Sequence, residues 1–206
     1  MKNVLIFDYD GVIVDSLSIF MKHFIFACKK EGFPSISSKN DFLKLFEKNM
    51  YESMFDLGMS KENILNIVYY MRDQLLKNQA KLDVFPEIKK VLPYLSRDNV
   101  LVVVTSNDTD VVKSFLKSHN VDFFDEIFGS DKDASKTAKI KKIKTLFDAD
   151  RYFYIGDTVG DIVEGELADV KTVAVSWGWH PRDKLLKAKP DFLIDYPSEL
   201  IDLLEK

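Results

Sequence analysis

The sequence predicts an α/β fold in which a doubly wound parallel sheet is interrupted by an all-helical insertion. Two observations predict the sheet: short apolar runs recur along the chain, and segments of helical period separate them. A third predicts the insertion, because residues 16–84 carry helical periodicity and no strand-like run. We therefore assign residues 1–15 and 85–206 to the core and residues 16–84 to a helical domain inserted into it.

The apolar runs are the expected strands. They are apolar on both faces and rich in β-branched residues, which is typical of parallel strands covered by helices on both sides. They comprise residues 4–7, 101–104, 152–155, 170–175 and 192–194. The expected helices between them span residues 110–119, 138–147 and 161–167.

The insertion begins with Phe20, Phe24 and Ala27, which are spaced to share one face of a helix. The chain returns to the core near Phe85-Pro86, where the proline is suited to the first turn of the next helix.

The composition fits a globular protein and argues against some partners. Hydrophobic residues make up 46% of the 206 residues, enough for a sizeable core. A formal net charge of −4 provides no basic field for nucleic acid, and no apolar stretch approaches membrane-spanning length. Cys28 is the only cysteine, so no intrachain disulfide can form. We expect a cytoplasmic protein without a nucleic-acid or membrane partner, and the oligomeric state stays open.

Asp8-Tyr9-Asp10-Gly11 follows the first expected strand. Two carboxylates two residues apart at a strand end can share one Mg²⁺, a hard cation that takes oxygen ligands. One of them can attack phosphorus, and the other can protonate the leaving oxygen and later activate water. A solvated Asp-Asp-Gly turn explains the same residues without any chemistry.

Two further polar clusters follow the strands at 101–104 and 152–155. Thr105-Ser106-Asn107 could hold a phosphoryl oxygen, and Asp157 with Asp161 could complete a metal site. Helix capping is the alternative interpretation of both clusters. Because ligands bind beyond the carboxyl ends of the strands in open α/β sheets, we expect the three clusters to converge.

Catalysis on a phosphate dianion also requires a cation. The lysine-rich segment 132–144 is where we expect it, although most of its lysines must belong to a solvated helix face.

In this order, the segments resemble the haloacid dehalogenase superfamily of phosphohydrolases over nearly the whole chain. Residues 8–16, Asp-Tyr-Asp-Gly-Val-Ile-Val-Asp-Ser, resemble its opening motif with almost no departure. Thr105 matches the hydroxyl residue of the second motif, and residues 156–161 match the paired aspartates of the fourth. Residues 175–179 resemble the aromatic-glycine loop of phosphoglycolate-phosphatase-like members. The resemblance implies a Rossmann-like core with a helical cap.

The resemblance also implies roles for the acidic residues. Asp8 would be the nucleophile and Asp10 the general acid/base. Mg²⁺ would be held by the Asp8 carboxylate, the Asp10 backbone carbonyl and Asp157, with Asp161 helping to hold the site.

The phosphoryl group would be bound by Thr105, with the backbone of Ser106 and Asn107. By position, Lys136 takes the role of the third-motif lysine. Thr137 follows it where many relatives have proline, so Lys132 and Lys139 stay as alternatives.

The expected activity is that of a Mg²⁺-dependent phosphatase acting on a small phosphorylated metabolite through an aspartyl-phosphate, similar to phosphoglycolate phosphatases. Asp10 argues against halide chemistry, which needs no acid/base carboxylate there. A phosphomutase of the β-phosphoglucomutase type and a non-catalytic phosphate- or metal-binding module remain as alternatives. We expect the cap to open and close as a lid, with residues 48–51 contacting the substrate.

Overall fold

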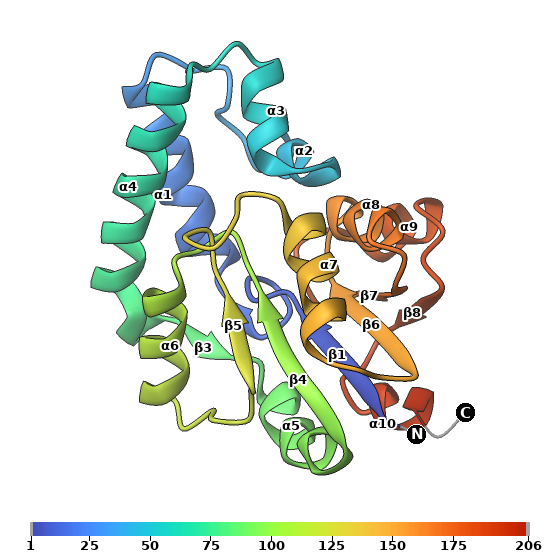
Figure 1. Cartoon of the computed structure of the whole chain (residues 1–206). Coiled ribbons are helices and arrows are strands. Elements are labelled where there is room, and N and C mark those ends of the chain that lie inside the picture. Colours follow the sequence, from blue (N-terminus) through green and yellow to red (C-terminus); the bar gives the residue numbers. More distant parts are fainter. Residues whose placement is uncertain (1, 205–206) are drawn as a thin grey trace.

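The computed structural model describes residues 2–204. Its core is a six-stranded parallel sheet in the order β5-β4-β1-β6-β7-β8 (Figure 1). The strands of this sheet are β1 (Asn3–Phe7), β4 (Asn99–Val104), β5 (Glu126–Phe128), β6 (Arg151–Gly156), β7 (Lys171–Val175) and β8 (Phe192–Ile194). From β1 the chain adds strands first on one side and then on the other, so β1 lies at the switch point where ligands bind in such sheets.

Helices surround this sheet and form the insertion. They are α1 (Leu17–Lys30), α2 (Lys39–Lys44), α3 (Met50–Asp56), α4 (Lys61–Asn78), α5 (Pro86–Asp98), α6 (Thr109–Ser118), α7 (Lys136–Leu146), α8 (Val159–Leu167), α9 (Arg182–Lys187) and α10 (Glu199–Leu204), with 3₁₀ turns η1 (Leu45–Glu47) and η2 (Gln79–Lys81).

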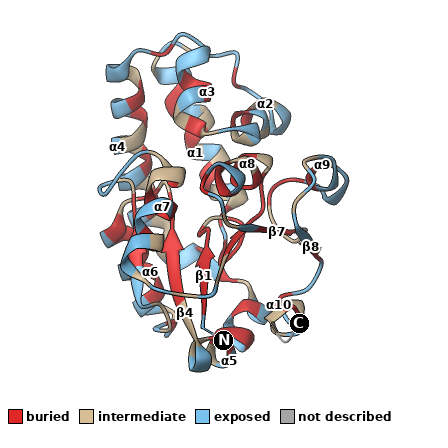
Figure 2. Ribbon diagram, turned by 45° about the vertical axis from the view of Figure 1, so that its right-hand side comes forward, coloured by how far each residue is buried: buried red, intermediate tan, exposed pale blue. Residues whose placement is uncertain are grey.

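Successive side chains of β1 point to opposite faces of the sheet, and each face packs against its own layer of helices. Val4 and Ile6 belong to the hydrophobic cluster that contains residues of α7, whereas Leu5 and Phe7 belong to the cluster that contains residues of α5, α6 and α10. Because helices cover both faces, β1 is buried along its whole length (Figure 2). The predicted α/β fold with a parallel Rossmann-like sheet is confirmed.

One strand of the sheet is absent from the sequence prediction. β5 has only three residues and begins with an exposed glutamate, so it carries too little apolar periodicity to be recognised. The five predicted strands all occur with small shifts of their ends, and α5 begins at Pro86 as expected.

A short antiparallel ladder marks the insertion. β2 (Val14–Asp15) pairs with β3 (Asp83–Val84), and between these strands the chain forms only helices and loops. The faces of α1 and α4 that carry Phe24, Ala27, Ile64 and Ile67 are buried. Figure 1 shows the inserted helices at the carboxyl ends of the sheet strands.

None of the helices within residues 2–204 combines the length and the apolar character that crossing a bilayer requires.

Candidate active site

Three acidic side chains meet at the carboxyl end of the sheet. Asp8 follows β1, Asp157 follows the neighbouring strand β6, and Asp161 lies in the first turn of α8. One carboxylate oxygen of each lies within 4.8 Å of the others, and all three residues are buried. This acidic cluster joins the first and fourth of the sequence motifs.

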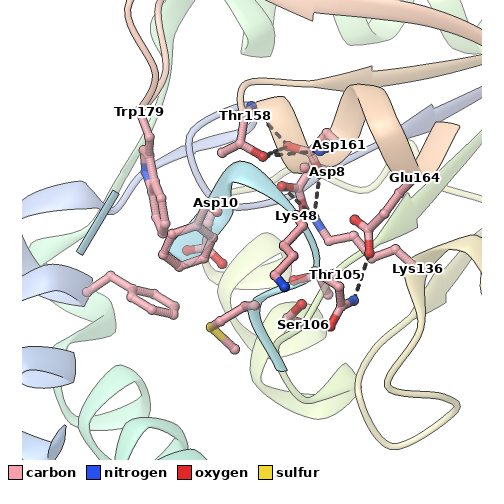
Figure 3. Close-up of a pocket in the computed structure, with 15 residues that line it drawn as sticks. Asp8, Asp10, Lys48, Thr105, Ser106, Lys136, Thr158, Asp161, Glu164 and Trp179 are labelled. Carbon is pink, nitrogen blue, oxygen red and sulfur yellow. Dashed lines mark hydrogen bonds and ion pairs between the residues drawn. The ribbon is translucent and has the colours of Figure 1, made fainter. Parts of the chain in front are cut away.

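Lys136 supplies the cation of the cluster (Figure 3). Its Nζ lies 2.9 Å from Asp8 Oδ2 and 2.7 Å from Asp161 Oδ1. The alternatives lie elsewhere: Lys139 Nζ donates to the backbone oxygen of Thr105 at 2.7 Å, and the nearest acidic partner of Lys132 is Asp131 at 3.9 Å. Among the described residues, Lys136 is thus the lysine whose ammonium group contacts Asp8.

Asp161 has both carboxylate oxygens engaged. Oδ1 also accepts a hydrogen bond from the Tyr154 hydroxyl at 2.8 Å, and Oδ2 accepts from the backbone N–H and the hydroxyl of Thr158. Thr158 caps α8 with Asp161 as the third helical residue, so the same contacts fix the helix end. Burial alone would raise the pKa of Asp161, but the ion pair with Lys136 and these hydrogen bonds hold it below the ordinary value.

Asp157 has one oxygen engaged and one without a partner. The backbone N–H of Trp179 donates to Oδ2 at 2.6 Å, whereas Oδ1 is buried without any hydrogen bond. Gly11 and Gly178 pack so closely against this carboxylate that a Cβ on either would overlap it. Gly11 also has a φ of +81°, which disfavours other residues.

A divalent metal ion fits this cluster. A buried carboxylate oxygen without a partner is costly, and a cation would satisfy it. The donors are oxygens only, which suits a hard cation. Asp8 and Asp157 are the side chains that would hold it, with Asp161, which binds Lys136, Tyr154 and Thr158, beside them.

The pKa shifts of the cluster reflect its burial. Desolvation raises the pKa of Asp8 to about 8 even though the Lys136 ammonium lowers it, and nearby Asp161 raises it further. Desolvation, together with the charges of Asp161 and Asp8, also raises the pKa of Asp157 well above its ordinary value. The folded protein without metal therefore retains protons that the unfolded chain releases.

We expect the metal-free protein to lose stability as the pH rises from about 6.5 to about 8.5. A carboxyl whose folded pKa is raised, such as that of Asp8, keeps a proton that the unfolded chain has already released, so stability falls as the pH rises from the ordinary value of 3.8 to about 8 and levels off above it. Thermal unfolding in a chelating buffer, at constant ionic strength, measures the effect. Added Mg²⁺ should raise the Tm more at pH 8.5 than at pH 6.5, whereas an equal increment at both pH values would contradict a metal site built on these carboxylates.

Asp10 lies outside the acidic cluster but lines the same cavity as Asp8. Its Oδ1 accepts a hydrogen bond from the Ser16 hydroxyl at 2.6 Å, and its Oδ2 accepts from the side-chain amide of Asn107 at 2.5 Å. Desolvation raises the pKa of Asp10 to about 6, although the bond from Ser16 and the charge of Lys136 lower it. A carboxyl with this pKa can be protonated or ionised near neutral pH, as general acid/base catalysis requires.

The loop after β4 brings two hydroxyl-bearing residues, Thr105 and Ser106, to the cavity that Asp8 lines. The backbone N–H of Asn107 donates to Thr105 Oγ1 at 3.0 Å, which leaves the Thr105 hydroxyl proton available for another acceptor. Thr105 and Ser106 line a small cavity of about 40 Å³ at the cluster (Figure 3). Asn107 is absent from that lining, and its amide supports Asp10. The capping residue of α6 is Asp108.

Residues of the insertion form part of the lining of this small cavity. Of the predicted substrate-contacting segment, Lys48, Asn49 and Met50 line it. Two hydrogen bonds join the insertion to the core, one at α8 and one at the loop before α9. Asn49 Nδ2 donates to Glu164 Oε1 at 2.7 Å, and His180 Nε2 lies 2.9 Å from the backbone oxygen of Leu43.

Several of these residues have no signal in the sequence. His180 is an isolated histidine, and its Nδ1 accepts the backbone N–H of Val159, so the proton lies on Nε2 and is donated to Leu43. Trp179 lines the small cavity, whereas Trp177 donates from Nε1 to the backbone oxygen of Val12. The aromatic-glycine motif pointed to this loop, but not to the backbone N–H of Trp179 as the partner of Asp157.

The family model that matches this chain is that of the haloacid dehalogenase-like hydrolases, over residues 5–175. The chain belongs to this family. As a haloacid dehalogenase-like hydrolase it is similar to a phosphoglycolate phosphatase of Synechococcus elongatus, which is 25% identical over 201 residues covering 96% of this chain and 94% of that protein. The pyrophosphatase PpaX of Bacillus anthracis is 24% identical over 209 residues, with coverage of 98% and 96%.

Solved structures agree with the assignment. A haloacid dehalogenase-like hydrolase from Streptococcus pneumoniae matches with a TM-score of 0.79 and 26% identity, covering 98% of this chain and 97% of that one. A protein described as a predicted phosphatase from Clostridium acetobutylicum matches with a TM-score of 0.84, at 23% identity and 99% coverage of both chains. The latter shares the fold.

Proposed function

We propose that the protein is a Mg²⁺-dependent phosphatase that hydrolyses a small phosphate monoester through an aspartyl-phosphate. The observation that carries the proposal is the contact between Asp8 and the buried ammonium of Lys136 inside the acidic cluster. A carboxylate approaches a phosphate dianion only where cations offset the repulsion. Asp8 and Asp157, with the Asp10 backbone carbonyl, would hold the Mg²⁺, which supplies further positive charge to the phosphoryl oxygens when bound.

The residues have distinct tasks in this proposal. An Asp8 oxygen forms a bond to phosphorus while the bond from phosphorus to the ester oxygen breaks. Asp10 gives its proton to that leaving oxygen, so an alcohol departs. Ionised Asp10 then takes a proton from the water that attacks the phosphorus of the aspartyl-phosphate, which releases inorganic phosphate and restores Asp8.

Four contacts prepare the groups for these steps. Ser16 and Asn107 hold the Asp10 carboxyl in place through hydrogen bonds. The Thr105 hydroxyl donates its free proton to a phosphoryl oxygen, and Asp161 keeps the Lys136 ammonium beside Asp8. Residues 16–84 act as the lid that excludes water from the site.

A phosphate-release screen over a panel of phosphorylated metabolites, with Mg²⁺ and with a chelator, tests the function. We expect release from at least one monoester, and only with the metal present. Phosphoglycolate and pyrophosphate belong in the panel because the named relatives are a phosphoglycolate phosphatase and a pyrophosphatase. Equal release in the chelating buffer would contradict the metal requirement.

Asp10→Asn should slow turnover by about 100-fold to 10,000-fold, the usual range for general acid–base catalysis. The variant cannot protonate the leaving oxygen or activate water, while Asp8 remains able to attack. With an activated ester such as p-nitrophenyl phosphate, which leaves without protonation, phosphorylated enzyme should accumulate.

Rapid chemical quench with a radiolabelled activated monoester measures that accumulation. Asp15→Asn is the matched control, because Asp15 lies on the same segment and its side chain is exposed. Absence of phosphorylated enzyme in the Asp10 variant, under conditions where the wild type turns over, would assign the acid/base role to another residue.

A further inference from the structure

A second, larger cavity continues from the catalytic site. It has a volume of about 380 Å³, within the range of about 300–1,000 Å³ that is usual for small-molecule sites. Phe20, Met50 and Ser106 line both this cavity and the small one at the acidic cluster. A substrate whose phosphoryl group reaches Asp8 therefore has the larger cavity as the adjacent space for the rest of the molecule.

The wall that the insertion contributes is mainly apolar, with Arg72 as its one charged residue among those described. Phe24 of α1 and Ile64, Ile67, Val68 and Met71 of α4 line it. Four of these five side chains are also buried in the hydrophobic core, which gives the wall a fixed shape, and Val68 packs against them. Contact with such a wall favours an apolar group over a hydrated one.

The charged groups of the larger cavity are already paired. Within residues 2–204, Arg72 is the only lysine or arginine in its lining, and its Nε lies 3.2 Å from Asp108 Oδ2. Asp131 accepts hydrogen bonds from the backbone N–H and the hydroxyl of Thr109. The lining thus carries two carboxylates and one guanidinium, so it offers no surplus positive charge.

The lysine of the insertion that lies at the phosphoryl site is also paired with a carboxylate. Lys48 lines the small cavity, and its ammonium group forms an ion pair with Asp56. A second anionic group on the substrate would have to compete with Asp56 for Lys48 or with Asp108 for Arg72.

We infer that the group esterified to phosphate is an uncharged alcohol with an apolar or aromatic body that occupies the larger cavity. This inference rests on the proposed function. It separates the substrate of this chain from phosphoglycolate and pyrophosphate, whose leaving groups are small anions. Polar atoms of the alcohol have partners at the core side, where Ser106 and Ser130 line the cavity.

Alkyl monoesters of similar chemical reactivity test the inference. We compare kcat/KM for 2-phenylethyl phosphate, phosphoglycolate and methyl phosphate with saturating Mg²⁺, and include pyrophosphate. The first three leave as alkyl alcohols, so a difference among them reports binding of the leaving group. We expect 2-phenylethyl phosphate to exceed both phosphoglycolate and methyl phosphate by at least about tenfold.

Two substitutions on α4 locate the effect. Val68→Lys places an ammonium group in the larger cavity, and Leu76→Lys places one on the same helix at an exposed position outside the cavity lining. Val68→Lys should lower the ratio of kcat/KM for 2-phenylethyl phosphate over phosphoglycolate by about tenfold or more. Leu76→Lys should leave that ratio unchanged. Leu65→Lys is a second cavity variant that folding tolerates more readily, because Leu65 is 42% exposed.

The outcomes separate the two proposals. Equal or better hydrolysis of phosphoglycolate by the wild type would overturn the inference about the alcohol and leave the phosphatase function intact. A ratio that both cavity variants leave unchanged would overturn the assignment to the larger cavity. Failure to hydrolyse any ester, p-nitrophenyl phosphate included, would overturn the proposed function and this inference with it.

Discussion

Asp8→Asn is expected to reduce the rate of phosphate release by at least about 1,000-fold, because the amide cannot displace the ester oxygen from phosphorus. The variant should also form no phosphorylated enzyme, which distinguishes loss of the nucleophile from loss of the acid/base. The measurement is phosphate release from p-nitrophenyl phosphate with Mg²⁺, together with rapid quench using a radiolabelled ester.

The fold should survive this substitution. Asparagine has nearly the same shape as aspartate and removes a buried carboxyl whose pKa is raised to about 8. Above that pH the variant without metal should therefore unfold at the same or a higher Tm than the wild type. Asp148→Asn is the matched control, since Asp148 is exposed and precedes the amino end of β6, whereas the cluster lies beyond the carboxyl end of that strand. Hydrolysis within tenfold of wild type in Asp8→Asn would rule out the proposed nucleophile.

Lys136→Met should abolish turnover and lower the free energy of unfolding by about 3 kcal/mol near neutral pH, the lower end of the cost of removing one partner of a buried ion pair. The loss follows mainly from Asp161, whose buried carboxylate would lose its ion pair with the Lys136 ammonium. Acidification should restore part of the lost stability, because a protonated Asp161 no longer needs a cationic partner.

Lys139→Met is the matched comparison for this prediction. Lys139 lies one turn further along α7, is equally buried, and donates only to backbone oxygens, those of Thr105 and Gly129. Its replacement should cost about 1–3 kcal/mol for the unsatisfied carbonyl groups, with little dependence on pH between about 5 and 7. Urea unfolding at both pH values measures the contrast. If the two variants lost stability and activity equally, Lys136 would have no special role beside Asp8.

The position of the site was predictable because of the parallel sheet. Residues that follow adjacent parallel strands meet at one edge, so Asp8, Thr105 and Asp157 could be expected together before any coordinates were available. The choice between Lys136 and Lys139 could not be made in this way. Both lie on the buried face of α7, three residues apart, and only the packing of α8 against α7 decides which ammonium group reaches the cluster.

The contacts of Asn107 and His180 show the other limit of the sequence. A backbone contact of Asn107 to phosphate stays a prediction, but nothing in the loop after β4 indicated that the side-chain amide of Asn107 donates to Asp10. His180 contacts a backbone oxygen in the insertion, and no residue pattern encodes a contact to a backbone group so distant in sequence. Loop conformation and the docking of one domain on another determine both contacts.

Helix α8 carries Asp161 at its start and Glu164, the partner of Asn49, one turn later. The residue that contacts the insertion and the residue that binds Lys136 therefore belong to one helix. Under the proposed function, a change in residues 16–84 that tilts α8 would alter the position of the Lys136 ammonium as well as the shape of the cavity that receives the substrate. During divergence of such an enzyme, selectivity and catalytic rate would tend to change together, and a shift to a new metabolite would call for compensating substitutions along α8.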